Sequence, residues 1–172
     1  RSFDHLNQHN RAVEAYGEAL HIDPKDANAW YLLGLSYTLA GQFDRSISAY
    51  RETLRIDPIN AEAWSYLGQA YAQAEKYTEE IEAYREALRI DPKNADVWSR
   101  LGMGYGATNQ YTQAIAAERE SLRIDPNRAS TWYNLGLEDA LNGNRDDAIE
   151  AYKILRKLDP KLADQLFDLV IA

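Results

Sequence analysis

Apolar residues recur along this chain at helical spacing, in two stripes that repeat together every 34 residues. Within residues 61–94, Trp64 and Tyr71 fall on the first stripe, and Ile81 and Leu88 fall on the second. Residues spaced by three, four or seven positions share one face of a helix, so each stripe predicts an amphipathic helix. Each unit is therefore expected to fold as two helices joined by a turn.

Start and stop signals separate these helices. The second helix of a unit is expected to end at Asp91, because Pro92 disfavours a helical conformation of the residue before it. In three units an aspartate or asparagine, such as Asn94, then stands just before the next helix and can cap its free N–H groups. Arg128 and Leu162 occupy that place in later units and cannot cap in this way.

Three residue types hold fixed positions in the repeat. They are Pro24, Pro58, Pro92, Pro126 and Pro160; Trp30, Trp64, Trp98 and Trp132; and Gly34, Gly68, Gly102 and Gly136. A glycine inside a helix costs about 1 kcal/mol relative to alanine, so a glycine at the same point of four helices predicts close helix–helix contact. We interpret the tryptophans as scaffold packing, with ligand stacking as the alternative.

This pattern resembles the tetratricopeptide repeat family. The first full copy of the family pattern reads Trp30, Leu33, Gly34, Tyr37, Ser46, Tyr50, Leu54, Pro58. The resemblance implies an all-α fold, a right-handed superhelical solenoid of antiparallel helix hairpins. It also implies that the first helix of each hairpin lines a concave groove that holds a peptide or partner segment, and that the family shares no chemistry of its own.

On this basis residues 1–172 are expected to form a single solenoid domain. Its parts are a partial repeat at 1–26, full repeats at 27–60, 61–94, 95–128 and 129–162, and a capping helix at 163–172. Leu166, Phe167, Leu169 and Val170 would lie on that helix and cover the open end. Because the chain starts inside a repeat, we expect a fragment whose truncated N-terminal edge self-associates or docks on another domain.

One face of the first helices does not follow the repeat, and we expect it to contact the partner. Its tyrosines offer a large contact area, and its leucines and methionine offer apolar surface. The guanidinium group of its arginine can bind a carboxylate through two hydrogen bonds. The candidate residues are Tyr31, Leu35, Tyr66, Gln69, Gln73, Arg100, Met103, Tyr133, Asn134 and Leu137. The alternative is that half of this face packs between repeats.

The repeat is broken near one joint, where three aromatic positions become charged. Glu118 replaces a tyrosine in the third full copy, and Asp139 and Arg145 replace aromatics in the fourth. Since an isolated buried carboxylate is costly, we expect Glu118 and Asp139 to pair with Arg145. A polar patch or salt-bridge cluster is one interpretation, and a cation or ligand site is the other.

Composition narrows the function further. The chain has no cysteine, a formal net charge of −8 and no Lys/Arg stripe, so thiol chemistry is excluded and nucleic acid is not an expected partner. No apolar run approaches the ~20 residues of a membrane span, and no signal-peptide pattern is present, which favours a cytoplasmic location. His5 and His9 lack a third ligand, and GMGYG at 102–106 lies within a helix, so we expect no metal, cofactor or nucleotide.

The sequence therefore predicts a non-catalytic protein–protein interaction scaffold that binds a peptide or partner segment in its groove. One alternative is a regulatory or substrate-docking array of a larger enzyme such as a glycosyltransferase. Arrays of that kind line the groove with an asparagine ladder, whereas this chain has Asn134 alone at that position. A homo-oligomerising assembly factor is the other alternative.

Overall fold

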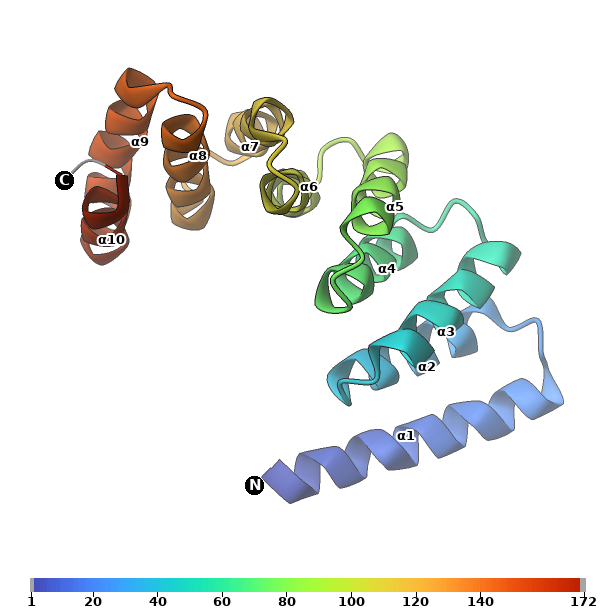
Figure 1. Ribbon diagram of the computed structural model, residues 1–172. Coiled ribbons are helices and arrows are strands. Elements are labelled where there is room, and N and C mark those ends of the chain that lie inside the picture. The colour runs from blue at the N-terminus through green and yellow to red at the C-terminus, as the bar shows by residue number, and fades with distance from the viewer. Residues whose placement is uncertain (1, 171–172) are drawn as a thin grey trace. The chain divides into compact units, whose positions relative to one another are not determined.

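The computed structural model of the chain describes the backbone of residues 2–170 and the side chains of residues 11–169. Over that range the chain forms ten α-helices and no strand (Figure 1). The helices are α1 (Ser2–Ile22), α2 (Ala27–Leu39), α3 (Phe43–Ile56), α4 (Ala61–Gln73), α5 (Tyr77–Ile90), α6 (Ala95–Ala107), α7 (Tyr111–Ile124), α8 (Ala129–Leu141), α9 (Arg145–Leu158) and α10 (Pro160–Val170). The predicted all-α repeat of helical hairpins is confirmed, with hairpins α2–α3, α4–α5, α6–α7 and α8–α9.

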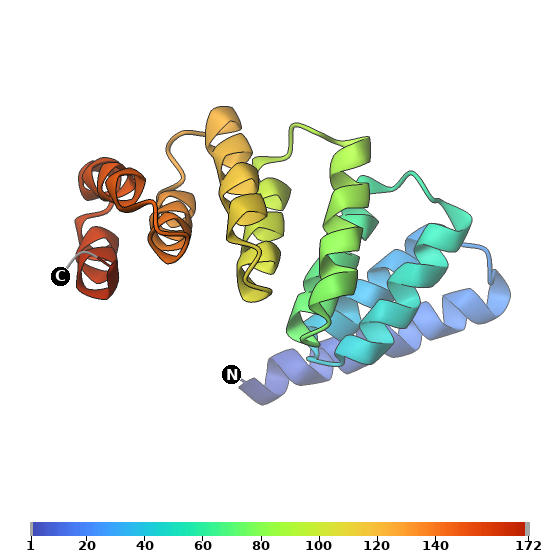
Figure 2. The same cartoon turned by 45° about the horizontal axis from the view of Figure 1, so that its top comes forward.

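The helices group into two compact units. Unit 1 contains α1 to α5 and extends to Asp91, and unit 2 contains α6 to α10 and begins at Pro92. In unit 1, α1 lies along α2, as both views show (Figure 1, Figure 2). Within each unit a helix packs mainly on its neighbours along the chain, so the core of each unit runs from hairpin to hairpin.

The predicted helix caps are present. Asp26, Asn60 and Asn94 each accept a hydrogen bond from the backbone N–H three residues on, at 3.0, 2.9 and 3.1 Å. Arg128 precedes α8 without a side-chain cap bond, as expected. The helix α8 thus begins with the same backbone conformation as the others but without the ~1 kcal/mol of stabilisation that a good N-cap side chain contributes.

The turn inside each hairpin uses one left-handed residue at the same repeat position. That residue is Gly41 in the first hairpin and Gly143 in the last, with φ of 71° and 85°. In the middle hairpins it is Glu75 and Asn109, with φ of 56° and 59°. Glycine and asparagine tolerate this conformation, whereas Glu75 has a β-carbon and no compensating short polar side chain, so it is strained.

In the first two hairpins the helical glycine admits a large side chain from the second helix of the same hairpin. A β-carbon added to Gly34 would lie 2.8 Å from the Tyr50 ring, and one added to Gly68 would lie 2.6 Å from the Tyr84 ring. Tyr50 and Tyr84 are almost completely buried. The close helix–helix contact predicted from the glycines is therefore confirmed, and the tyrosine ring fills the space that the missing side chain leaves.

The tryptophans join the first helix to the connection before it. Each indole N–H donates to the carbonyl of the proline six residues earlier, as in Trp64 to Pro58 at 3.0 Å. The same bond is made by Trp30, Trp98 and Trp132, at 3.0, 3.0 and 2.8 Å. The rings are half-buried, and this bond explains why tryptophan and proline recur together.

The closing helix begins at Pro160, ahead of Ala163, where the sequence placed the start of a capping helix. Asp159 accepts a hydrogen bond from the Leu162 N–H at 3.1 Å, and proline suits the first helical position because it needs no N–H partner. Leu166 of α10 is fully buried. The helix therefore starts as soon as α9 has ended.

Leu166 packs against the first helix of the last hairpin. A β-carbon added to Gly136 on α8 would lie 2.6 Å from its Cδ2 atom. Phe167 and Leu169 remain 39% and 64% exposed, so α10 covers the α8–α9 hairpin with one face only. Val170 was expected on this face, but its side chain lies outside the described residues.

Candidate partner-binding surface

In unit 1 the candidate surface lies on α2 and α4, which we call the unit 1 first-helix surface. The rings of Tyr31 and Tyr66 lie 5.9 Å apart edge to face, and the Tyr50 ring lies 5.9 Å from Tyr31 and 6.0 Å from Tyr66. Both surface tyrosines pack on the buried core around Tyr50 and are half-buried. They form a rigid aromatic wall whose inner sides belong to the core and whose outer sides reach the surface.

The hydroxyl group of Tyr31 on this wall and that of Tyr50 beneath it stay neutral. Burial, together with a hydrogen bond to Glu62 and the charge of that carboxylate, raises the pKa of Tyr31 far above its ordinary value. Burial also raises the pKa of Tyr50 to about 12. The wall therefore offers apolar rings and the neutral hydroxyl of Tyr31, and Glu62 is the exposed charge beside them.

The other candidates of unit 1 complete the same surface. Leu35 and Gln69 are half-buried, and Gln73 is exposed at the end of α4. Leu39, at the end of α2, is 59% exposed. An exposed leucine next to amide side chains is a mixed surface that can bury apolar groups and bind a peptide backbone.

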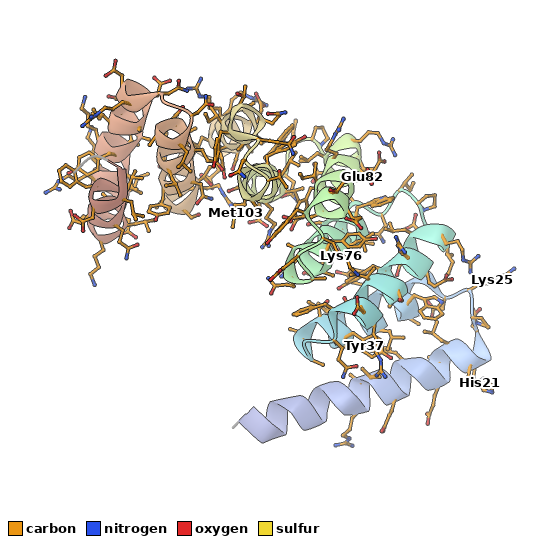
Figure 3. The ribbon with its side chains drawn as sticks, viewed as in Figure 1. His21, Lys25, Tyr37, Lys76, Glu82 and Met103 are labelled. Carbon is orange, nitrogen blue, oxygen red and sulfur yellow. The ribbon has the colours of Figure 1, made fainter. Side chains whose placement is uncertain are left out.

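Unit 1 also contains an ion pair that joins its two complete hairpins. Lys76, at the turn before α5, reaches toward α3, and its Nζ lies 3.0 Å from Asp44 (Figure 3). Because both side chains are largely exposed, this pair contributes at most a fraction of 1 kcal/mol.

In unit 2 the corresponding surface lies on α6 and α8, which we call the unit 2 first-helix surface. Met103 is 56% exposed and projects from α6 on the side away from α7 (Figure 3). Tyr133 and Leu137 of α8 are half-buried and pack on the core formed with α9 and α10. Leu141, at the end of α8, is 55% exposed.

Arg100 takes part in an ion network. Its Nε donates to Asp96 at 2.7 Å, and Arg128 donates to the other oxygen of Asp96 at 2.9 Å. Burial alone would raise the pKa of Asp96, but hydrogen bonds from the two arginines and their charges hold it below its ordinary value. A partner carboxylate would have to compete with Asp96 for Arg100, which sequence reasoning did not anticipate.

Glu118 lies beneath this surface and is fully buried. Asn134 donates to its Oε1 at 3.2 Å, while no described residue donates a hydrogen bond to its Oε2. Burial raises the pKa of Glu118 to about 8, although hydrogen bonds from Ser99 and Asn134 and the charge of Arg128 lower it in part. Asn134 is therefore both a surface candidate and a partner of a buried acid.

Glu138 is a second buried acid, and the sequence analysis missed it. It is 5% exposed, and its Oε2 also has no hydrogen-bond partner among the described residues. Burial, followed by the charges of Glu118 and Asp139, raises the pKa of Glu138 to about 9. The signal in the sequence was a glutamate at a repeat position otherwise held by small residues, namely Ser36, Ala70 and Gly104.

Asp139 and Arg145, the other members of the irregular joint, occupy different environments. Asp139 is 1% exposed, accepts from the Asn144 amide at 3.1 Å and lies 4.0 Å from Arg119. Burial raises the pKa of Asp139, although Asn144 and Arg119 oppose the shift. Arg145 is exposed on the first turn of α9. The pairing of Arg145 with the two acids stays a prediction.

Each unit also has an open cleft beside a tryptophan, at the same repeat positions. The cleft in unit 1 has a volume of about 390 Å³ and that in unit 2 about 320 Å³. The first is lined by Arg51, Leu54, Arg55, Trp64, Leu67, Tyr71, Glu79, Glu82 and Ala83. Most of this lining recurs in unit 2, where Asp139 and Asp147 stand in place of Tyr71 and Glu79 and Ile154 is added, so we attribute both clefts to the repeat itself.

The described residues also bear on metal binding and on membrane insertion. No group of three or more His, Cys, Asp or Glu side chains there is arranged to hold a metal ion. None of the described helices combines the length and apolar character that crossing a membrane requires. His5 and His9 lie where side chains are not described.

Comparison with known families accounts for the repeat. Two models described as "Tetratricopeptide repeat" match residues 39–95 and 83–116, and one described as "TPR repeat" matches residues 5–39. The chain is a tetratricopeptide repeat protein. Among curated protein sequences none matches it significantly. Tetratricopeptide repeat proteins of known structure nevertheless resemble it along most of its length.

Three solved structures illustrate the likeness. The crystal structure of MamA has a TM-score of 0.87 at 25% identity, covering 92% of each chain. YrrB, described as "a TPR protein with an unusual peptide-binding site", has a TM-score of 0.86 at 22% identity, covering 95% of this chain and 86% of its own. MamA of Desulfovibrio magneticus RS-1 has a TM-score of 0.84 at 18% identity, covering 89% and 86%. These likenesses show an all-α helical repeat solenoid.

Proposed function

We propose that this protein is a non-catalytic interaction scaffold that binds a peptide or an extended partner segment on its first-helix surfaces. The observation that carries the proposal is the exposure of large apolar side chains there. Leu39, Met103 and Leu141 are 59%, 56% and 55% exposed, although each belongs to a helix whose other large apolar side chains are buried or half-buried. Because this surface varies between repeats while the scaffold positions stay constant, we attribute its exposed apolar side chains to partner binding.

The aromatic and polar candidates fit this role. Tyr31, Tyr66 and Tyr133 are held by core contacts, so they lose little conformational entropy when a partner covers them. Gln69 and Gln73 on α4 supply amide groups that can pair with a peptide backbone. YrrB, whose description names a peptide-binding site, has the same fold, which supports peptide binding here as well.

The test uses the exposed apolar residues, because changing them leaves the core intact. Peptides selected from a random library displayed on phage are measured against the wild-type chain by fluorescence anisotropy. The triple variant Leu39→Ser, Met103→Ser, Leu141→Ser should bind them at least about tenfold more weakly, since each lost contact removes apolar burial worth ~1 kcal/mol or more.

The matched control changes exposed apolar residues that lie outside the first helices. Ile22 and Ile59 are 85% and 72% exposed, at the end of α1 and in the α3–α4 connection. The variant Ile22→Ser, Ile59→Ser should bind like the wild type. Equal binding by the triple variant and the wild type would refute the assignment of the first-helix surfaces.

A further inference from the structure

We propose that the unit 2 first-helix surface recognises a positively charged side chain, a lysine or arginine of the partner segment, through Glu118 and Glu138. This inference rests on the proposed function and specifies the partner that unit 2 selects. Glu138 belongs to α8, one of the two helices that form this surface, and Glu118 belongs to α7, directly beneath it. Each acid has one buried carboxyl oxygen without a hydrogen-bond partner among the described residues.

The two acids replace residues that normally fill the scaffold. Glu118 stands where Tyr50 and Tyr84 fill the space beside a helical glycine, and its carboxyl group occupies the space beside Gly102 instead. A β-carbon on Gly102 would lie 2.8 Å from the carboxyl oxygen Oε1 of Glu118. In unit 2 the Glu118 carboxyl group therefore occupies the position at which unit 1 has the Tyr50 ring, on which Tyr31 and Tyr66 pack.

Glu138 is accompanied by a second glycine. A β-carbon added to Gly106 on α6 would lie 2.8 Å from the Oε1 atom of Glu138. The equivalent positions in other repeats are Thr38, Ala72 and Ala140, so glycine occurs only in the repeat that faces this acid. The sequence thus makes room for a carboxyl group between α6 and α8 rather than merely tolerating it.

A cation is the ligand that satisfies this arrangement. Burying a carboxyl oxygen without a partner costs free energy, and the charge of Glu118 adds to the cost of ionising Glu138. A lysine ammonium has three donors and an arginine guanidinium has five, so either can bind two carboxylates at once. The formal net charge of −8 also attracts a basic segment over a longer range.

The surroundings provide access for such a side chain. Gly106 and Asn134 are half-exposed at the surface, and Gly106 has no side chain to cover Glu138. Met103 lies one helical turn before Gly106 on the same face of α6 and is exposed, so the aliphatic stem of a lysine can pack on it.

The charged groups around the pair determine how binding depends on pH. Asp139 neighbours Glu138 on α8, Arg128 precedes α8 and acts on Glu118, and α6 presents two glycines there. Because both acids hold most of their protons at pH 7, a cation that binds both carboxylates must displace a proton from each. Its affinity should therefore rise by more than about tenfold from pH 7 to pH 8, while lysine and arginine stay charged.

The experiment uses two probe peptides that differ only in charge, acetyl-Ala-Lys-Ala-amide and acetyl-Ala-norleucine-Ala-amide. In ¹H–¹⁵N correlation spectra at pH 8, the lysine peptide should shift the amide signals of Gly102, Gly106 and Asn134, and the norleucine peptide should not. The variant Glu118→Gln, Glu138→Gln should lose at least about tenfold in affinity for the lysine peptide. Circular dichroism of this variant checks that a loss of affinity does not come from unfolding.

The control and the library peptides separate this inference from the proposed function. Glu120 lies on the same helix as Glu118 and pairs with Arg123 at the surface, so Glu120→Gln should bind the lysine peptide like the wild type. Some library peptides could bind the first-helix surfaces without a basic residue and bind the double variant as tightly as the wild type. That result would overturn the cation site and leave the proposed scaffold function intact. Equal shifts from both probe peptides, or none, would overturn it as well. Lysine-specific shifts without any library binder would instead leave the cation site standing and reject the broader scaffold role.

Discussion

The sharpest prediction concerns Glu118→Gln, which should stabilise the protein at neutral pH. Burial raises the pKa of Glu118 in the folded state to about 8, whereas its ordinary value is 4.5. A carboxyl group with a raised pKa contributes stability that is fully present below pH 4.5 and is lost as the pH rises toward 8. The glutamine variant has no proton to lose and should not show this decline.

The magnitude follows from the interval between the two pKa values. Each pH unit inside it lowers the free energy of unfolding by about 1.4 kcal/mol, so at pH 7 the wild type has lost about 3 kcal/mol. The variant keeps the acceptor for Asn134 because an amide oxygen replaces the carboxyl oxygen. From pH 4.5 to pH 7 the variant should therefore gain about 3 kcal/mol relative to the wild type. Its unpaired amide protons cost about 0–2 kcal/mol at every pH, so it should be that much less stable than the wild type near pH 4.5 and about 1–3 kcal/mol more stable at pH 7.

Urea unfolding followed by circular dichroism, at pH 5, 6, 7 and 8, provides the measurement. Glu120→Gln serves as the control, because Glu120 is an acid of the same helix that pairs with Arg123 at the surface. The control should parallel the wild type at every pH. A constant difference between Glu118→Gln and the wild type across this range, or a less stable variant at pH 8, would refute the reasoning.

Two further predictions concern the scaffold. Gly68→Ala should lower stability by about 2 kcal/mol or more, because the new β-carbon would lie 2.6 Å from the Tyr84 ring. Gly17→Ala in α1 should stabilise by about 0.5–1 kcal/mol, because its β-carbon would meet nothing within 4 Å. Thermal unfolding of both variants checks the sign of each change. Glu75→Gly should raise stability by up to about 1 kcal/mol, because φ at Glu75 is 56°. Equal melting temperatures for wild type and Glu75→Gly would contradict the claim of backbone strain.

Periodicity made the scaffold predictable from sequence. The helices, their caps and the glycine contacts follow from local rules that repeat in every unit, so Asn94 or Gly68 could be interpreted without coordinates. The partner of Gly68 is less evident, because nothing in the local pattern states that a ring sixteen residues later fills its space. The hydrogen bond from the Trp64 indole to the Pro58 carbonyl likewise explains why tryptophan and proline recur at a fixed spacing, for which the sequence alone gives no reason.

The candidate surface was less predictable because it depends on pairs between repeats. Asp96 and Arg100 are four residues apart, so their ion pair could have been anticipated from the sequence. The contribution of Arg128 requires α8 to lie beside α6, which spacing alone does not give. Glu138 is harder to recognise because it interrupts a row of small residues, whereas Glu118 and Asp139 interrupt conspicuous aromatic positions.

The locality of the contacts has a kinetic consequence. Hydrogen bonds between neighbouring hairpins join residues only 32 positions apart in the sequence, as between Lys76 and Asp44 or Thr131 and Ser99. Native pairing therefore requires only short loops to close, and chains of low contact order fold in microseconds to milliseconds. A nascent chain could complete each hairpin while the next is being synthesised, leaving few apolar segments waiting for a distant partner.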